Sequence, residues 1–312
     1  MSDIDAGKAV GAGFSVISRR PLSVLAWGLT VGAFLFIAVL ALAPLLQLIL
    51  AKSGDAQASA DLTSYLGAMV KFQTASTAVN LGSIFLRAVI ICAVFRAVLT
   101  PEASAFAYMR VGMSELFLAV FIFGAAFALV LLILVVAAPF ILCVVWLAVA
   151  HNVGAAVIVG LVGFVVDVSL AIWLAVRLSL LGPMIVVSRE FPLGEAWALT
   201  RGRAGSLFLI GLLIVLILLA LEIVVFGIAG VLGIGLLGDL PHSQEDLRSF
   251  VSRPFGELLA GLAPVLALAW LAISIFAGVA SAITSAPWAA AYRQLAPIPG
   301  TTPAAASTAT SV

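Results

Sequence analysis

Residues 177–212, RLSLLGPMIVVSREFPLGEAWALTRGRAGSLFLIGL, decide the fold because they join two long apolar runs through a short charged turn. The turn at residues 188–190 is followed by a brief amphipathic segment around Trp197, by Arg201 and Arg203, and by a new apolar run from Ser206. Arginines between two apolar runs are typical of a loop that faces the cytoplasm and leads back into a membrane. The pattern predicts a chain that crosses a membrane repeatedly.

The composition of the whole chain agrees with this prediction. Of 312 residues, 64% are hydrophobic and 9% are charged, and the mean hydropathy is +1.29. About a quarter of the residues of a soluble domain are charged, so the chain is expected to be a polytopic membrane protein. Its net charge of +1 argues against a nucleic-acid partner, because phosphate binding needs clustered cations. The thiols of Cys92 and Cys143 lie in apolar runs, where we expect them to pack as hydrophobic side chains.

Six stretches reach the length of about 20 apolar residues that a transmembrane helix needs. They are residues 22–50, 78–99, 116–149, 153–187, 206–238 and 258–292. A re-entrant pair within residues 116–149 is the alternative to one long span. Before the first span, Val10, Phe14 and Ile17 lie at helical spacing and predict an amphipathic helix at the membrane interface. The predicted fold is an all-α transmembrane bundle of about six spans with short cytoplasmic interfacial helices.

The distribution of cations predicts how these spans are oriented. With both termini on one side, that side carries nine cations: Lys8, Arg19, Arg20, Arg96, Arg110, Arg189, Arg201, Arg203 and Arg293. The opposite side carries four: Lys52, Lys71, Arg248 and Arg253. This asymmetry places both termini in the cytoplasm. Residues 1–296 are predicted to form a single integral membrane domain, and the Pro-, Thr- and Ala-rich residues 297–312 a disordered cytoplasmic tail.

Three segments each contain an aromatic residue, then a basic residue, then a membrane span, and this similarity predicts a threefold internal repeat. They are residues 14–28, 106–121 and 197–212. The last two align without a gap at an offset of 91, which matches Arg110 with Arg201 and Phe117 with Phe208. Each unit would be an interfacial helix followed by two spans. The alternative is that every re-entry into a membrane favours an aromatic residue and an arginine independently.

The segment quoted first also suggests a family. Its residues Arg177, Leu178, Pro183, Ile185, Val186 and Glu190, followed by Ala196, Trp197, Leu199, Thr200, Arg201 and Gly202, resemble the re-entry segment of the bacterial membrane-domain family related to that of glycerophosphoryl diester phosphodiesterases. The similarity is best over residues 173–212 and extends more weakly over about 76–293. It implies a multi-helix bundle in the bacterial inner membrane. It does not imply phosphodiesterase activity, because a separate soluble domain carries the catalytic residues in the fused enzymes.

Charged residues within the apolar runs are the candidate functional residues. Each costs about 2.5 to 3.5 kcal/mol at the centre of a span, on insertion scales for Arg and Asp. Arg87 and Asp167 precede the cytoplasmic ends of their spans by similar distances, so we predict that they lie at one depth and form a buried charge pair. Glu222 is a lone acid among Leu, Ile and Val, and Arg177 is its candidate partner. The alternative role of these residues is a substrate, ion or proton path.

Two further patterns have structural explanations. Gly227, Gly230 and Gly233 in one span, and Gly278, Ala282 and Ala286 in the last, are expected to allow close packing of helices in lipid. The loop 238–254 holds Asp239, His242, Glu245 and Asp246, a sparse set of potential metal ligands. We expect a helix cap at Ser243 there instead, and we predict no metal site, no cofactor and no catalytic constellation.

The leading functional hypothesis is a non-catalytic inner-membrane protein that organises or stabilises envelope components. Its expected partners are membrane lipids and another membrane or envelope protein. The alternative is a transporter or lipid-handling protein that uses the buried charges. A closed bundle with paired charges would favour the first, and a cavity that reaches Arg87, Asp167 or Glu222 would favour the second. An intramembrane enzyme is the third hypothesis, for which the sequence offers no catalytic set.

Overall fold

The computed structural model describes residues 4–54, 62–102, 105–236 and 255–296, and these residues form helices without any strand. The helices are α1 (Ala6–Arg19), α2 (Pro21–Gly54), α3 (Leu62–Leu99), η2 (Ala105–Tyr108), α4 (Met113–Val149), α5 (Val153–Leu178), α6 (Leu181–Ser188), α7 (Leu193–Thr200), α8 (Ala204–Leu236) and α10 (Phe255–Leu295). Six helical segments are long and apolar enough to cross a membrane. The protein is a multi-pass membrane protein, and the predicted fold class is confirmed.

The fourth predicted span, residues 153–187, coincides with the candidate span Val153–Ser188. It consists of two helices, because α5 ends at Leu178 and α6 begins at Leu181. Pro183 lies in the first turn of α6 and cannot donate the amide hydrogen bond that a continuous helix requires. The chain therefore bends at this point, and residues 181–185 are buried in the protein. In contrast, α4 is one helix throughout, with Pro139 inside it, so the alternative of a re-entrant pair does not occur.

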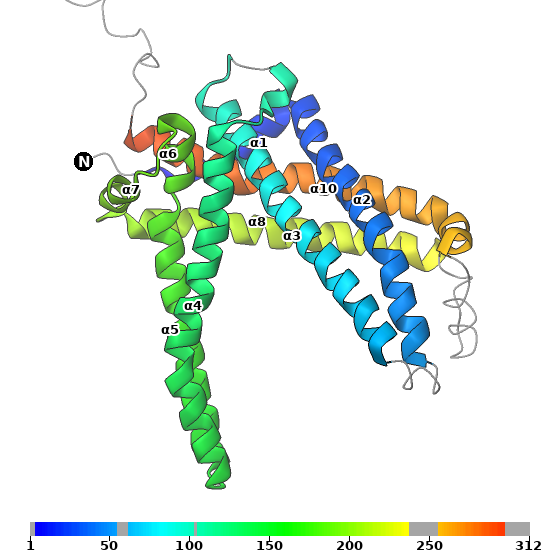
Figure 1. Cartoon of the computed structure of the whole chain (residues 1–312). Coiled ribbons are helices and arrows are strands. Elements are labelled where there is room, and N and C mark those ends of the chain that lie inside the picture. The colour runs from blue at the N-terminus through cyan, green and yellow to red at the C-terminus, as the bar shows by residue number, and fades with distance from the viewer. Residues whose placement is uncertain (1–3, 55–61, 103–104, 237–254, 297–312) are drawn as a thin grey trace, which may run out of the picture.

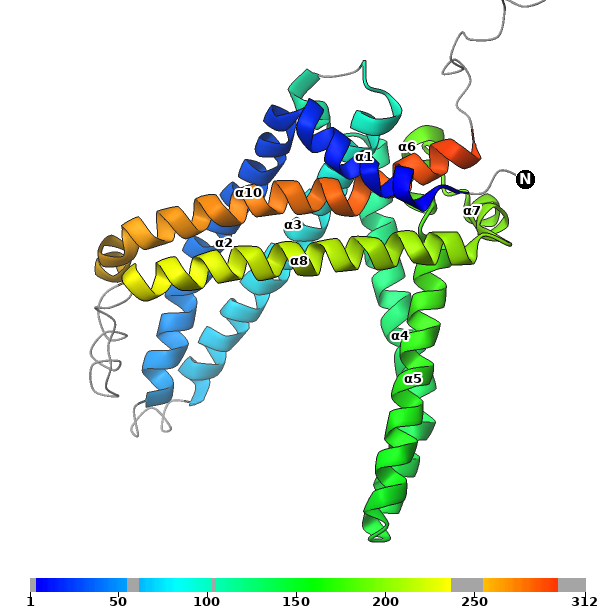
Figure 2. The same ribbon diagram turned by 180° about the vertical axis from the view of Figure 1, so that it is seen from behind.

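The long helices are arranged in three pairs that diverge from one end of the molecule (Figure 1). In one pair, α4 and α5 form a hairpin that projects away from the remaining helices. In the second pair, α2 packs against α3. In the third pair, α8 and α10 run side by side and cross the other two pairs (Figure 2). The short helices α1, α6 and α7 gather near the end of the molecule where α3 and α10 finish. The main buried core lies at this end, which we call the pole.

The closest helix contact joins α2 to α10 and depends on glycine. A Cβ atom at Gly278 would lie 2.3 Å from the carbonyl oxygen of Val24, and one at Gly28 would lie 2.0 Å from that of Ser274. The indole Nε1 of Trp270 donates a 2.7 Å hydrogen bond to the carbonyl oxygen of Gly32 in the same interface. We call this contact the α2–α10 seam. The close packing predicted at Gly278 is thus confirmed, whereas a Cβ at Gly227 would meet no neighbour within 4 Å.

The first helix forms as expected, but a different face is buried. The expected apolar face held Val10, Phe14 and Ile17; Val10 is buried, whereas Phe14 is half exposed. The buried face consists of Ala6, Ala9, Val10, Gly13 and Val16. Small residues allow α1 to lie close to α10: a Cβ at Gly13 would be 3.2 Å from the Cα of Ile283. Steric fit against a neighbouring helix, and not side-chain hydrophobicity, therefore selects the face.

The order of elements follows the proposed repeat. Met113 begins α4 and Ala204 begins α8, at the separation of 91 residues that the sequence alignment predicts. A short helix, η2 or α7, precedes each of them, as α1 precedes α2. The tail at residues 297–312, the loop ligands and the cap at Ser243 lie outside the described residues, and the repeat itself stays a prediction.

Candidate functional site: two cavities between the long helices

The first cavity lies between α2, α3 and α10 and is lined in part by Arg87, which is itself exposed. Its volume is about 320 Å³. Apolar side chains such as Phe34 and Ile90 form part of its wall, and hydroxyl groups form another part. These hydroxyls belong to Ser83, Ser281, Thr284 and Ser285. The cavity is therefore a partly polar chamber next to an intramembrane cation, and we call it the Arg87 chamber.

Local helix geometry determines what the chamber hydroxyls can do. Ser281 donates to the carbonyl oxygen of Ala277 at 2.7 Å, and Thr284 donates to that of Ala280 at 2.8 Å. Each hydroxyl thus uses its proton within its own helix, and its oxygen lone pairs remain as acceptors. The chamber offers a cation and several weak acceptors, a combination that suits a polar group carrying both an acidic function and a hydroxyl.

The second cavity is larger and mainly apolar. It has a volume of about 420 Å³ and lies between α3, α4, α5, α6 and α10. Ala125, Ala175 and other small or apolar side chains line it. Ile91, Thr284 and Ser285 line both this cavity and the Arg87 chamber. We call this second cavity the apolar cleft; it meets the Arg87 chamber at those three residues.

The predicted pair of Arg87 and Asp167 does not form in this structure. Among the described residues, the ion pairs are Lys8 with Asp5 and Arg96 with Glu115. Arg87 lies on α3, whereas Asp167 lies on α5, in the hairpin that diverges from α3 (Figure 1). The sequence analysis predicted that both residues lie at the same depth in the membrane. Depth alone does not show that the two helices diverge. Oδ1 of Asp167 is buried and has no hydrogen-bond partner within the described part of the chain.

The predicted partnership of Arg177 with Glu222 is also not formed. The guanidinium of Arg177 lies 5.1 Å from the ring centroid of Trp197 and 5.8 Å from that of Trp173. The face of an indole ring attracts a cation electrostatically, so the two rings offset part of the cost of the charge. Nε and one terminal nitrogen of Arg177 are buried without a hydrogen-bond partner among the described residues. Glu222 itself is exposed on α8. Arg177 therefore anchors α7 to the end of α5.

The structure contains a buried ion pair that sequence reasoning missed. A guanidinium nitrogen of Arg96 bonds a carboxylate oxygen of Glu115, whose side chain is only 1% exposed. The same guanidinium donates a 3.3 Å hydrogen bond to the carbonyl oxygen of Tyr108. Arg96 stands in the last turn of α3 and Glu115 in the first turn of α4. A cation near the end of one span and an acid at the start of the next were a usable signal, but Arg96 was counted only as a cation of the cytoplasmic side, and Glu115 was given no role.

The segment between these two residues is held in an unusual conformation. Ala107 and Tyr108 have φ values of 53° and 64°, a left-handed region that is costly for residues with a side chain. The indole Nε1 of Trp27 donates a 2.8 Å hydrogen bond to the carbonyl oxygen of Ala107. The Tyr108 hydroxyl donates to the carbonyl oxygen of Pro101 at 2.9 Å. These contacts fix the joint between α3 and α4 at the pole.

Over the described ranges, no three His, Cys, Asp or Glu residues lie close enough together to hold a metal ion. The potential ligands of the loop 238–254 lie outside those ranges, so the absence of a metal site stays a prediction.

No protein-family model matches the chain, and neither a curated protein nor a solved structure matches it. The resemblance to the membrane domain of glycerophosphoryl diester phosphodiesterases therefore remains a prediction.

Proposed function

We propose that this protein is a non-catalytic, lipid-handling membrane protein that holds an amphiphile with an acidic head group. The observation that carries the proposal is the meeting of the apolar cleft with the Arg87 chamber. A closed bundle with paired charges would have favoured an organising protein. The chamber at Arg87, together with the failure of both expected charge pairs to form, supports lipid handling instead.

The two cavities have complementary chemistry. An alkyl chain would lie in the apolar cleft and contact its walls, which are small and apolar side chains. The head group would lie in the Arg87 chamber, since a guanidinium can donate two parallel hydrogen bonds to a carboxylate or phosphate. Volumes of about 320 and 420 Å³ fall within the usual range of small-molecule sites.

The energetics of Arg87 favour such a ligand. Arg87 precedes Leu99, the last residue of α3, by twelve positions, or roughly 18 Å along a helix. If Leu99 lies at the edge of the hydrocarbon layer, this distance would put the guanidinium well inside it, where an arginine costs about 2.5 to 3.5 kcal/mol on insertion scales. Within the described ranges no acid forms an ion pair with it. An acidic head group would offset that cost.

The proposal is tested by mass spectrometry of lipids retained by the protein in native membrane discs. Ala125→Phe fills the apolar cleft, whereas Ala128→Phe adds the same ring on the same helix at a position outside the cleft. We expect the first variant to lose an enriched amphiphile and the second to keep it. Arg87→Gln should retain amphiphiles but lose the preference for acidic ones. Equal lipid profiles for the wild type and all three variants would contradict the proposal.

An organising role with a protein partner is the second candidate. Its support is α7, which exposes Leu193 and Trp197 at the pole while burying Ala196 and Thr200. A protein that copurifies stoichiometrically with the wild type and is lost from Leu193→Ser would support this role over lipid handling.

For the location, we propose the bacterial inner membrane with both termini in the cytoplasm. The excess of cations on the side of the termini supports this orientation. The backbone N–H of Asp5 also donates a 2.9 Å hydrogen bond to Oε1 of Gln294, so the first and last described helices meet at one end of the molecule. Labelling of single cysteines at the two termini in intact cells would test it; a label reaching either terminus from outside would refute it.

A further inference from the structure

We propose that the cavity between α1 and the ends of α3 and α10 is a binding site for the phosphate group of an anionic membrane lipid. This cavity has a volume of about 720 Å³. We call it the basic cavity, because Lys8, Arg19, Arg20 and Arg293 line it and Asp5 is the only acid among the described residues that line it. It shares no lining residue with the apolar cleft or the Arg87 chamber, so the inference does not depend on the function proposed above.

The position of the cavity matches the depth of lipid phosphates. Arg19 and Arg20 directly precede the span that starts at Pro21, and Ala97 and Val98 lie at the end of the span that finishes at Leu99. Arg293 lies near the end of the span that finishes at Leu295. One span thus begins and two spans end around the cavity. The ends of spans lie at the boundary between hydrocarbon and head groups, where basic pockets between helices bind anionic lipids.

Two of the four cations, Arg20 and Arg293, are held in place before any ligand arrives. Arg20 donates a 3.0 Å hydrogen bond to the carbonyl oxygen of Pro101, and its guanidinium lies 4.7 Å from the ring centroid of Tyr108. Arg293 donates to the carbonyl oxygen of Val98 at 3.3 Å. Both arginines contact the chain at the end of α3 and retain further N–H donors. Preorganised donors reduce the entropy that a ligand loses on binding.

The electrostatics of the cavity favour an anion. Lys8 lies 3.5 Å from Asp5, but three arginines line the same space without an ion pair among the described residues. Like charges around one cavity repel each other, and a bound phosphate would reduce that repulsion. Arginine is also suited to phosphate because its planar guanidinium matches two oxygens at once.

The cavity wall favours a lipid over a small ion as the source of the phosphate. Val16, Ala97, Val98 and Ala290 line the same space as the cations. Apolar atoms next to phosphate-binding donors suit a glycerol backbone and the first atoms of acyl chains. A site for inorganic phosphate alone would need no apolar wall of this kind.

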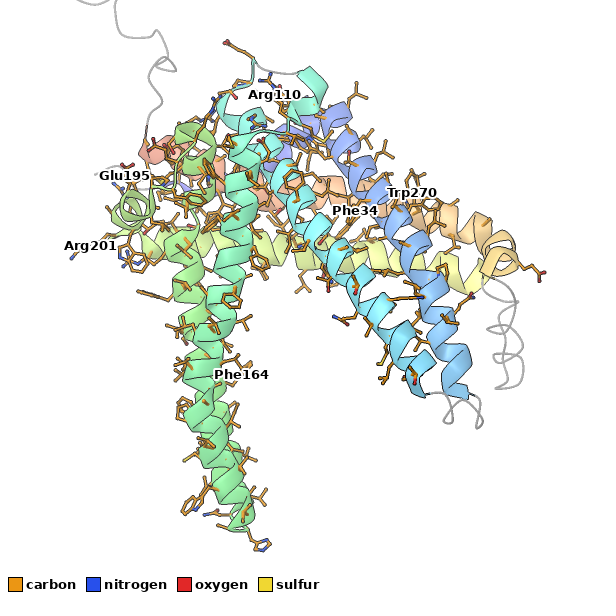
Figure 3. All side chains as sticks on the ribbon, viewed as in Figure 1. Phe34, Arg110, Phe164, Glu195, Arg201 and Trp270 are labelled. Atoms are coloured by element: carbon orange, nitrogen blue, oxygen red, sulfur yellow. The ribbon has the colours of Figure 1, made fainter. Side chains whose placement is uncertain are left out.

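The test compares two double variants that remove the same charge from the full-length protein. Arg19→Gln with Arg293→Gln removes two cations from the basic cavity. Arg110→Gln with Arg201→Gln removes two exposed cations outside the cavity, on the same predicted face (Figure 3). Binding is titrated by native mass spectrometry in detergent, with phosphatidylglycerol against phosphatidylcholine. At about 1 kcal/mol per cation, the cavity variant should lose preference for phosphatidylglycerol by about 30-fold, and the control by less than about threefold.

Arg293 also contacts α3, so its substitution removes a contact within the fold. A second cavity variant, which leaves Arg293 in place, controls for that loss. Lys8→Gln with Arg19→Gln changes two exposed side chains and should show a similar loss of preference with an unchanged melting temperature. Equal losses in cavity and control variants, or no preference of the wild type for phosphatidylglycerol, would overturn the proposal. Displacement of phosphatidylglycerol by millimolar inorganic phosphate would overturn its assignment to lipid, whereas the absence of displacement supports it.

Discussion

The α2–α10 seam and the α4–α5 hairpin are both built from long apolar helices, yet at the seam backbone meets backbone, whereas the close contact at Gly163 in the hairpin is to a side chain. Beyond Ala119, α4 has no buried residue, and Phe164 of α5 is exposed on the hairpin (Figure 3). At the seam, Gly28 and Gly278 bring two backbones into contact, and Ser274 is 1% exposed. Lipid solvates an apolar side chain as well as a protein core does. Small residues, and not the most hydrophobic ones, therefore decide which helices pack.

The largest expected effect tests the joint where the hairpin meets the packed half. Glu115→Gln removes the charge that pairs with Arg96 and leaves a buried cation uncompensated. Loss of one partner of a buried pair costs about 3 to 5 kcal/mol. We expect a large decrease in melting temperature, measured by intrinsic tryptophan fluorescence. Glu102→Gln changes an exposed acid of the same loop and should have no measurable effect; equal effects would show that the pair contributes little.

The next effect tests the seam directly. Gly278→Ala places a Cβ 2.3 Å from the carbonyl oxygen of Val24, an atom that cannot move without the backbone. The two helices must separate, which we expect to lower stability by about 3 kcal/mol. Gly124→Ala on α4 meets no atom within 4 Å and should be neutral or slightly stabilising. Similar melting temperatures for the two variants would show that an added methyl group is tolerated at the seam as well as on α4.

A smaller effect is expected within the hairpin. Gly163→Ala places a Cβ 2.7 Å from Cγ of Phe140, a side-chain atom. Most side chains of the hairpin beyond Ala119 are exposed, so its two helices can move apart with little loss of other contacts. We expect a loss of about 1 kcal/mol, below that of Gly278→Ala in the same assay. The reverse order would mean that the hairpin is the more tightly packed region.

The smallest effect concerns the start of α1, outside the spans. The Asp5 carboxylate accepts the backbone N–H of Lys8 at 3.0 Å, and this hydrogen bond, opposed by desolvation, lowers the pKa of Asp5 below its ordinary value of 3.8. A lowered pKa in the folded state contributes stability above the ordinary pKa, and that stability is lost as pH falls through the folded-state value. The wild type should therefore lose a small stabilisation below about pH 4. Asp5→Ala should lack it at every pH, so the two melting curves should converge in acid; a constant difference would contradict this assignment.

The sequence predicted the classes of elements well, because composition and span length are local properties. It located six spans, the interfacial helices around residues 1–18 and 197, and the small residues at Gly278. It placed the break near Pro183 inside a span, since one proline can be absorbed as a kink or can end a helix. The strength of local packing decides between these outcomes, and only the structure shows that packing.

The candidate site was less predictable. Arg87 was recognised as an intramembrane charge, but its predicted partner lies on a helix that diverges from α3. The contact of Arg177 with Trp197 and the pairing of Arg96 with Glu115 also escaped prediction, because each joins two different helices whose relative position the sequence does not give.

By itself, the sequence determined that this chain is an all-α, multi-pass membrane protein, since about 20 consecutive apolar residues are sufficient to specify a span. Only the tertiary structure decided which spans pack, where the cavities lie and which charges meet. Hydrophobicity drives a helix into the bilayer but hardly distinguishes one neighbour from another once it is there. Steric fit and hydrogen bonding between distant segments make that choice, and they are properties of the folded chain.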